Sequence, residues 1–242
     1  MKEMIKVFKK ANIIVNSYKI DSIKAEDIKQ NVTIGLAFPV AFQSTFPFIW
    51  DFFKKFPQAN KTPIFMVDTM MSFSGGIMGP LKKLFKQKGY DCIGAKEIIM
   101  PNNWLRKSIN PEKDNEKIKN GLMKARLYAE LLINGDAKWG RIPFLSDFVH
   151  KLCCNKLVMN KINLAQGKKI EVEKAKCVHC GLCSKICPIN NISFDNYPLW
   201  GKSCQLCMRC LSYCPSNAII IQGKKFIAYN VVKIEEIMND SV

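Results

Sequence analysis

The chain lacks the features that direct a protein into a membrane or out of the cytoplasm. Its opening residues, Met1 to Lys6, place Lys and Glu among apolar side chains, so we do not expect a signal peptide. The long uncharged stretch from Asn31 to Trp50 is interrupted by two prolines and several polar residues, which argues against a membrane helix. A strand, a loop and a helix start explain it better. We therefore expect a cytoplasmic protein that does not enter the membrane.

Acidic residues are scarce relative to basic ones. The 242 residues include 37 Lys and Arg but only 20 Asp and Glu, a formal net charge of +17. Such a charge attracts acidic partners or nucleic acid. The lysines are dispersed, however, and no aromatic–basic binding motif accompanies them, so a solvated surface is the simpler interpretation. We do not expect nucleic-acid binding, and an acidic partner protein is the more specific alternative.

Histidine is rare, with two residues, whereas cysteine is abundant. Eight of the eleven cysteines fall into two copies of the spacing C-x-x-C-x-x-C-x-x-x-C-P. The copies begin at Cys177 and, 27 residues later, at Cys204, and Pro-x-Asn-x-Ile continues both of them. A repeat of this length indicates a duplicated structural unit. Cys92 is interpreted as a core residue of a strand, and Cys153 and Cys154 as spare thiols, because they lack the spacing.

The spacing itself predicts iron–sulfur chemistry. Three thiolates two residues apart, on a loop entering a helix, can converge on three corners of one iron–sulfur cube. The fourth cysteine precedes a proline that ends the helix, and in two-cluster ferredoxins it ligates the other cluster. We therefore predict two [4Fe–4S] clusters: one held by Cys177, Cys180, Cys183 and Cys214, the other by Cys204, Cys207, Cys210 and Cys187.

Two alternatives explain the cysteines less well. Disulfides are disfavoured because nothing in the chain indicates secretion and each triplet crowds its thiols. Zinc prefers four ligands per site, arranged as two pairs separated by a longer loop. Residues 169–223 resemble bacterial-type two-cluster ferredoxins, which implies that this segment is a small α+β domain.

Upstream of the motifs, predicted helices and strands alternate. An amphipathic helix is expected near residues 1–11, and strands at 12–20, 31–39, 63–67 and 90–100. Further helices are expected from a cap at Ser44 through Phe56, after the loop at 72–76, and from Pro111 to Gly135. This alternation predicts a parallel, doubly wound sheet.

The order of these elements resembles the flavodoxin-like fold, and with the C-terminal motifs the chain is similar to the family of flavodoxin–ferredoxin fusion proteins. The implied fold class is an α/β flavodoxin-like doubly wound parallel sheet plus a small α+β two-[4Fe–4S] ferredoxin domain. The resemblance implies that FMN is embraced by the loops at 39–42 and 71–76, with Ser72, Ser74 and Gly75 as cofactor-binding residues. Two ordinary turns explain these loops equally well.

The chain departs from that family at its start. The first strand and the phosphate-binding loop of flavodoxins are absent, because the sequence opens inside what would be the first helix. The expected explanations are a start upstream of the recorded one, a fragment, or closure of the gap by the neighbouring strands. FMN binding therefore stays an open alternative for this chain as written.

These observations predict the domain organisation and the function. The predicted parts are a flavodoxin-like domain lacking its start (1–138), a connector that docks the domains (139–168), a ferredoxin domain (169–223) and a tail (224–242). The predicted function is one-electron transfer between redox partners, without catalytic residues, and Lys185 and Arg209 are expected to raise the cluster potentials. The alternative is an FMN-linked iron–sulfur oxidoreductase.

Trp104 is interpreted as an aromatic at a domain boundary, with flavin stacking as the alternative.

Overall fold

The chain folds as two compact units in the computed structural model, which describes residues 1–242 except 73–75, 105, 141–168, 231 and 239–242. The first unit comprises Met1–Pro101 and Pro111–Asn155, and the second comprises Asn102–Asn110 and Lys156–Val242. The chain therefore contributes nine residues to the second unit before it returns to the first. Residues 141–168 of the predicted connector, including Cys153 and Cys154, lie outside the described residues.

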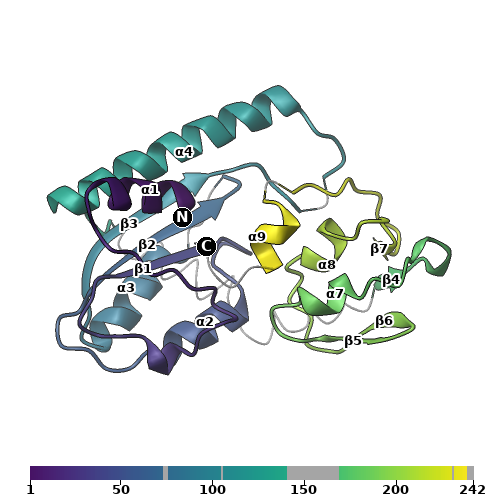
Figure 1. The fold of residues 1–242 in the computed structure, drawn as a ribbon, viewed down its shortest axis with the longest axis horizontal. Helices are drawn as coiled ribbons and strands as arrows, with labels where there is room; N and C mark the ends of the chain where they lie inside the picture. Colours follow the sequence, from purple (N-terminus) through teal and green to yellow (C-terminus); the bar gives the residue numbers. More distant parts are fainter. Residues whose placement is uncertain (73–75, 105, 141–168, 231, 239–242) are drawn as a thin grey trace. The chain divides into compact units, whose positions relative to one another are not determined.

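A three-stranded parallel sheet forms the centre of the first unit (Figure 1). Its strands are β1 (Ile34–Pro39), β2 (Pro63–Met70) and β3 (Asp91–Ile99), in the spatial order β1-β2-β3. The helices are α1 (Lys2–Lys10), α2 (Pro47–Lys54), α3 (Met78–Gln87) and α4 (Pro111–Asn134), with a short 3₁₀ helix η1 (Ala25–Asp27). The predicted parallel α/β arrangement is confirmed, and the flavodoxin-like assignment stays a prediction.

Each face of the sheet has its own apolar core. On one face, Ile34, Leu36 and Phe38 of β1 pack with α2, α3 and alternate residues of β2. On the other, Phe65 and Val67 of β2 pack against α1 and α4. Successive side chains of a strand point to opposite faces, so this alternation makes β2 a central strand covered on both sides.

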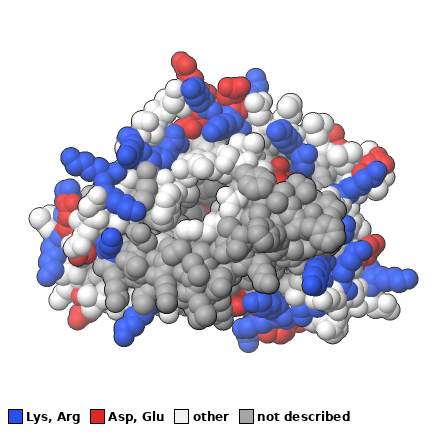
Figure 2. All heavy atoms as spheres, turned by 180° about the vertical axis from the view of Figure 1, so that it is seen from behind, with Lys and Arg blue, Asp and Glu red and all other residues white. Residues whose placement is uncertain are grey.

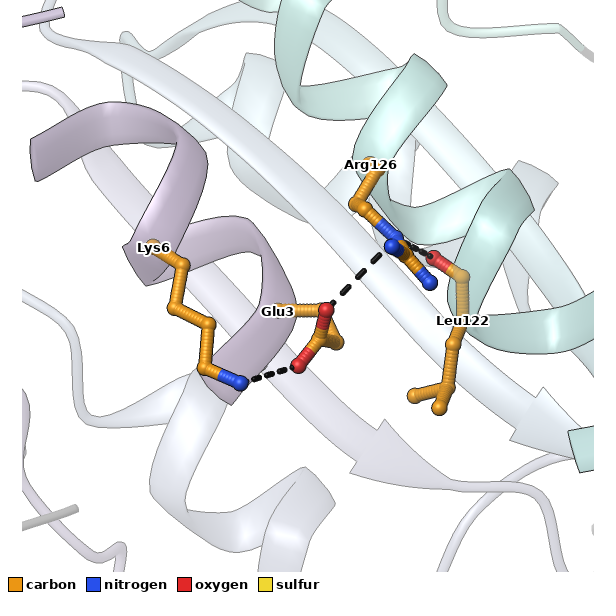
Figure 3. Close-up of polar contacts among 4 residues, drawn as sticks. All are labelled: Glu3, Lys6, Leu122 and Arg126. Carbon is orange, nitrogen blue, oxygen red and sulfur yellow. Dashed lines mark hydrogen bonds and ion pairs between the residues drawn. The ribbon is translucent and has the colours of Figure 1, made fainter. Parts of the chain in front are cut away.

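Charged contacts join α1 to α4 (Figure 3). Glu3 lies 2.6 Å from Lys6 Nζ and 3.5 Å from Arg126 Nε, and Arg126 Nε also donates to the Leu122 carbonyl at 3.3 Å. The hydrogen bond from Lys6 is the largest cause that holds the pKa of Glu3 below its usual value. These contacts align α1 with α4 over the apolar core between them.

Two local predictions are wrong. The strand predicted at 12–20 does not form: the segment has no regular structure, and Ile14 is 90% exposed. An unpaired strand leaves its backbone groups unsatisfied, so an apolar run alone does not make one. Ser44 is not a helix cap, because α2 begins at Pro47 with Phe46 as its N-cap. Its hydroxyl instead accepts a hydrogen bond from Trp50 Nε1 at 3.0 Å.

The second unit repeats one motif. Its elements are β4 (Ile170–Val172), η2 (Lys174–Lys176), α7 (Leu182–Lys185), β5 (Ile192–Asp195), β6 (Tyr197–Trp200), α8 (Arg209–Ser212), β7 (Ile219–Ile221) and α9 (Ile234–Met238). The 27-residue offset superposes β4 on β6, α7 on α8 and β5 on β7. Pairing is crosswise and antiparallel: β4, which opens the first copy, pairs with β7, which ends the second, and β5 pairs with β6.

Within the part of the chain that the structure describes, no helix is both long enough and apolar enough to cross a membrane.

Candidate metal centre

A pocket in the second unit gathers cysteines from both copies of the motif. Its lining includes Cys177, Cys180 and Cys183 of the first copy and Cys214 of the second. The rest of the lining is mostly apolar and includes Val172, Leu182, Phe194, Pro198 and Ile219. The pocket encloses about 320 Å³ of empty space, open solvent at its mouth included. It therefore presents four thiols in a largely apolar setting.

The other four motif cysteines act on one another electrostatically. Burial raises the pKa of Cys204, Cys207 and Cys210, and the neighbouring Cys187 thiolate adds to the increase in each. Burial likewise raises the pKa of Cys183, and Cys180 and Cys214 add to it. Each fourth cysteine thus lies close enough to influence the triplet of the opposite copy.

The backbone explains how the loops turn toward their centres. Left-handed residues recur at the repeat offset: His179 and Leu206 have φ of 54° and 57°, and Asn190 and Asn217 have 49° and 50°. Gly181 and Met208, which precede α7 and α8, have 66° and 64°. A left-handed residue reverses the chain sharply, so that the thiols on either side of it turn inward.

Backbone amides serve the fourth cysteine of each copy in the same way. Asn191 N donates to Cys187 Sγ at 3.3 Å, and Ala218 N donates to Cys214 Sγ at 3.3 Å. These donors are again 27 residues apart. Donors directed at sulfur stabilise a thiolate, which is the form that binds metal.

The thiols are free to ligate. Among the described residues, Cys92 and all eight motif cysteines carry free thiols. Among the described residues, no three His, Cys, Asp or Glu side chains lie close enough together to hold a single metal ion. An iron–sulfur cube accepts a wider arrangement, because each of its four irons takes a different thiolate.

Two segments outside the predicted ferredoxin boundaries pack onto the cysteine-rich unit. Trp104 and Phe226 contact the apolar core that contains Leu206, Met208 and Leu211. Asn230 Nδ2 donates to the Ser212 carbonyl, and Tyr213 OH donates to the Val232 carbonyl at 2.8 Å. Trp104 is therefore a packing residue of this unit, a role that its position between a strand and a helix in the sequence does not reveal.

The same two segments are attached to each other. Ile227 N donates to the Arg106 carbonyl at 2.7 Å, and the Arg106 guanidinium lies 4.2 Å from the centroid of the Tyr229 ring. We call Trp104, Arg106, Phe226, Tyr229 and Asn230 the cover. The cover brings residues more than a hundred positions apart in sequence together on the cysteine-rich unit.

The residues predicted to bind FMN are only partly described. Ser72 is exposed in the bend after β2, whereas Ser74 and Gly75 lie outside the described residues. Gly76 N, at the end of the second predicted loop, donates at 2.8 Å to the carbonyl of Gln43, the residue directly after the first predicted loop. Phe42, the last residue of the first loop, and Gln43 directly after it have left-handed backbone.

Sequence reasoning missed a buried carboxyl group in the first unit. Asp68, near the carboxyl end of β2, is fully buried, and neither of its carboxylate oxygens has a hydrogen-bond partner. Burial raises its pKa to about 8, and Glu97, its neighbour across the β2–β3 pair, adds to the shift. The signal in the sequence was an acidic residue directly after the apolar run Ile64 to Val67.

Comparison with known proteins identifies one part of the chain. Residues 170–193 match the family model described as "4Fe-4S binding domain". The match covers the first copy of the cysteine motif, from β4 to the first half of β5. No curated protein matches the chain, and no solved structure matches it. The chain thus contains an iron–sulfur domain of the kind that transfers electrons.

Proposed function

We propose that this protein carries electrons between redox partners through two [4Fe–4S] clusters bound crosswise. One cluster would be held by Cys177, Cys180, Cys183 and Cys214, and the other by Cys204, Cys207, Cys210 and Cys187. When bound, each cluster supplies reversible uptake of one electron. The observation that carries the proposal is the pocket that gathers the first triplet together with the last cysteine of the second copy.

The strand pairing supports crosswise ligation independently of the pocket. Because β4 pairs with β7 and β5 with β6, each half of the unit consists of the beginning of one copy and the end of the other. The last cysteine of a copy precedes its last strand, so it lies in the half that contains the opposite triplet. The match of residues 170–193 supports [4Fe–4S] binding by the first copy, and the repeat extends the assignment to the second.

The surrounding residues set the conditions for electron transfer. Apolar residues in and beside the motifs, among them Ile186, Leu206 and Leu211, exclude water from the thiolates. Amides of Asn191 and Ala218 donate to sulfur. Arg209 lowers the pKa of Cys207 against the larger effect of burial, so it favours negative charge there. Donors and positive charge near sulfur raise the reduction potential.

Anaerobic reconstitution tests the proposal. We expect about eight irons and eight sulfides per chain, as two four-iron clusters require, and an EPR signal after reduction. The variants Cys214→Ser and Cys187→Ser distinguish crosswise ligation, in which each fourth cysteine binds the cluster of the opposite triplet, from ligation in which it binds the cluster of its own triplet. In a Cys183→Ala background, Cys214→Ser should cause little further loss of iron, because both residues serve one cluster, whereas Cys187→Ser should remove the second. The reverse result would reject crosswise ligation.

A flavin-dependent function is the second candidate. It is favoured by the hydrogen bond that joins the loops after β1 and β2, because ligands of open α/β sheets bind at the carboxyl ends of the strands. The purified protein would then be yellow and release FMN on denaturation. If the purified protein binds no added FMN in a fluorescence titration, the flavin-dependent function is rejected and electron transfer by the clusters is the function that remains.

The charge of the protein favours an acidic redox partner over nucleic acid. On the face shown in Figure 2, the Lys and Arg side chains of the described residues are interspersed with Asp and Glu instead of forming one continuous patch. Nucleic-acid binding requires several phosphates to be neutralised together. The net charge, formally +17 before any cluster is bound, nevertheless attracts acidic proteins at long range. Electron transfer to an acidic carrier should therefore slow as ionic strength rises.

A further inference from the structure

The two copies of the cysteine motif have similar backbone conformations, but their side chains differ in solvent exposure. Val178 is 62% exposed, and His179 and Cys180 are exposed beside it. At the equivalent positions of the second copy, Gln205 and Cys207 are partly buried and Leu206 is 3% exposed. The difference continues into the helices, where Lys185 is exposed and its counterpart Ser212 is buried.

The cover lies beside the second copy of the motif. Asn230 and Tyr213 attach the C-terminal segment to the end of α8, and Trp104 and Phe226 pack against the apolar core that both copies share. Arg106 then ties the two segments of the cover together through Ile227 and Tyr229. An exact repeat would make two equivalent copies, so the asymmetry comes from residues outside the repeat together with differences within it.

Side chains within the second loop are also more buried than their counterparts in the first loop. Gly181, at whose position an added Cβ would meet nothing within 4 Å, corresponds to Met208, which is 4% exposed. His179, whose ring lies 4.7 Å from that of Tyr197 at the surface, corresponds to the buried Leu206. Larger apolar side chains thus close the second loop where the first stays open.

We propose that electrons enter and leave this protein at the exposed loop Val178–Gly181, and that the covered half, with Cys204, Cys207, Cys210 and Cys187, exchanges electrons only through it. The proposal rests on the two-cluster function proposed above. Electron transfer weakens steeply with distance, so the half whose thiolates lie nearest the surface meets the partner first. The cover would then protect the inner half from solvent and from oxidants.

Charges placed at the loop test where electrons leave. The reduced protein is mixed anaerobically with hexaamminecobalt(III), which takes one electron from the protein and becomes cobalt(II). Val178→Glu should speed oxidation and Val178→Lys should slow it, with a total difference of about tenfold at low ionic strength that shrinks in high salt. The matched control is Leu199, equally exposed at 61% but on the strand β6. Leu199→Glu and Leu199→Lys should differ by less than about twofold.

Iron release tests the protection by the cover. In the full chain, a chelator should remove half of the iron in a fast phase and half in a slow one. Arg106→Ala should speed the slow phase by roughly three- to tenfold, since it removes the contact with Tyr229. Lys107→Ala, at the adjacent exposed position, should leave both phases unchanged. The variant Cys180→Ser, which lacks a ligand of the exposed half, should keep only the slow phase of iron release. The variant Cys207→Ser, which lacks a ligand of the covered half, should keep only the fast phase.

The outcomes separate this inference from the function on which it rests. A chain that binds far fewer than eight irons would reject the two-cluster function and this inference with it. If the chain binds eight irons but releases them in a single phase, or if its oxidation responds equally to charges at positions 178 and 199, the proposed electron exchange at the loop Val178–Gly181 is rejected. The two-cluster function would then still stand. The iron content of each variant is therefore measured before its kinetics.

Discussion

At the scale of single residues, the two loops of the cysteine-rich unit place different residues at the same left-handed position, and the two residues differ in backbone strain and in burial. Both need a left-handed residue before their helix, and the first uses Gly181, which adopts that conformation without penalty. The second uses Met208, which incurs about 1 kcal/mol of strain but is buried in the core. Burial of a side chain of this size outweighs such strain, so methionine is the stable choice where the loop is covered.

This balance predicts opposite roles for the two positions. Met208→Gly should lower the free energy of unfolding of the reconstituted protein by about 1–3 kcal/mol, because lost packing exceeds relieved strain. Gly181→Met should lower it by about 1 kcal/mol, because strain is added with no core to fill. Thermal melts followed by cluster absorbance measure both. A Met208→Gly variant more stable than the parent would show that strain dominates at this position.

Asp68 makes the stability of the first unit depend on pH. In the unfolded chain an aspartate loses its proton near pH 3.8, whereas burial keeps Asp68 protonated in the fold until about pH 8. Between these values the folded state holds one proton more, so the free energy of unfolding falls as pH rises, by about 1.4 kcal/mol per unit. Asp68→Asn should remove this slope between pH 5 and pH 7 and leave the unit more stable at pH 7.

Denaturant titrations at pH 5, 6 and 7 check this expectation. The neighbouring Glu97→Gln is the matched variant: it keeps Asp68 but removes the carboxyl that adds to its pKa shift, so part of the slope should persist. Equal slopes in the parent and in Asp68→Asn would place the pH dependence in other groups.

At the scale of elements, the sequence was informative where its local signals agreed with long-range packing. Pro111 and Gly135 bound a helix in the sequence, and α4 follows them closely as Pro111–Asn134. The segment at 12–20 has the apolar residues of a strand but does not form one, because a strand depends on a neighbour that local sequence does not specify. The cover was unpredictable for the same reason: nothing near Arg106 in sequence indicates Tyr229.

The packing of α4 on β3 depends on the lack of a side chain at Gly121. A Cβ there would lie 2.6 Å from Met100 Sδ and 3.1 Å from Ile98 Cγ2. Gly121→Leu should therefore lower the free energy of unfolding of the first unit by about 1–3 kcal/mol, although leucine is the better helix former. Asn120→Leu, at the exposed neighbouring position, should change it by less than about 0.5 kcal/mol. Circular dichroism during urea denaturation compares the two, and equal effects would mean that α4 moves freely to admit a side chain.

At the scale of the whole molecule, the two units differ in what holds them together. The first has two apolar cores on either side of a sheet, built from aromatic and aliphatic residues such as Phe53, Phe85 and Tyr128. The second has one core, whose partly buried border consists largely of motif cysteines, among them Cys183, Cys187 and Cys204. A unit of this kind gains much of its stability from the metal that its thiolates bind.

Removal of iron should therefore unfold one unit and spare the other. After anaerobic chelation, hydrogen exchange measured by mass spectrometry should show loss of protection in β4 to β7, while β1, β2 and β3 stay protected. Peptides from residues 102–110 provide the sharpest comparison, because the sequence places them between β3 and α4 whereas the fold places them in the second unit. They should lose protection together with residues 224–230. If they instead keep the protection of β3, or if β2 exchanges as fast as β7, then the two units do not fold as independent bodies, and the metal stabilises the entire chain.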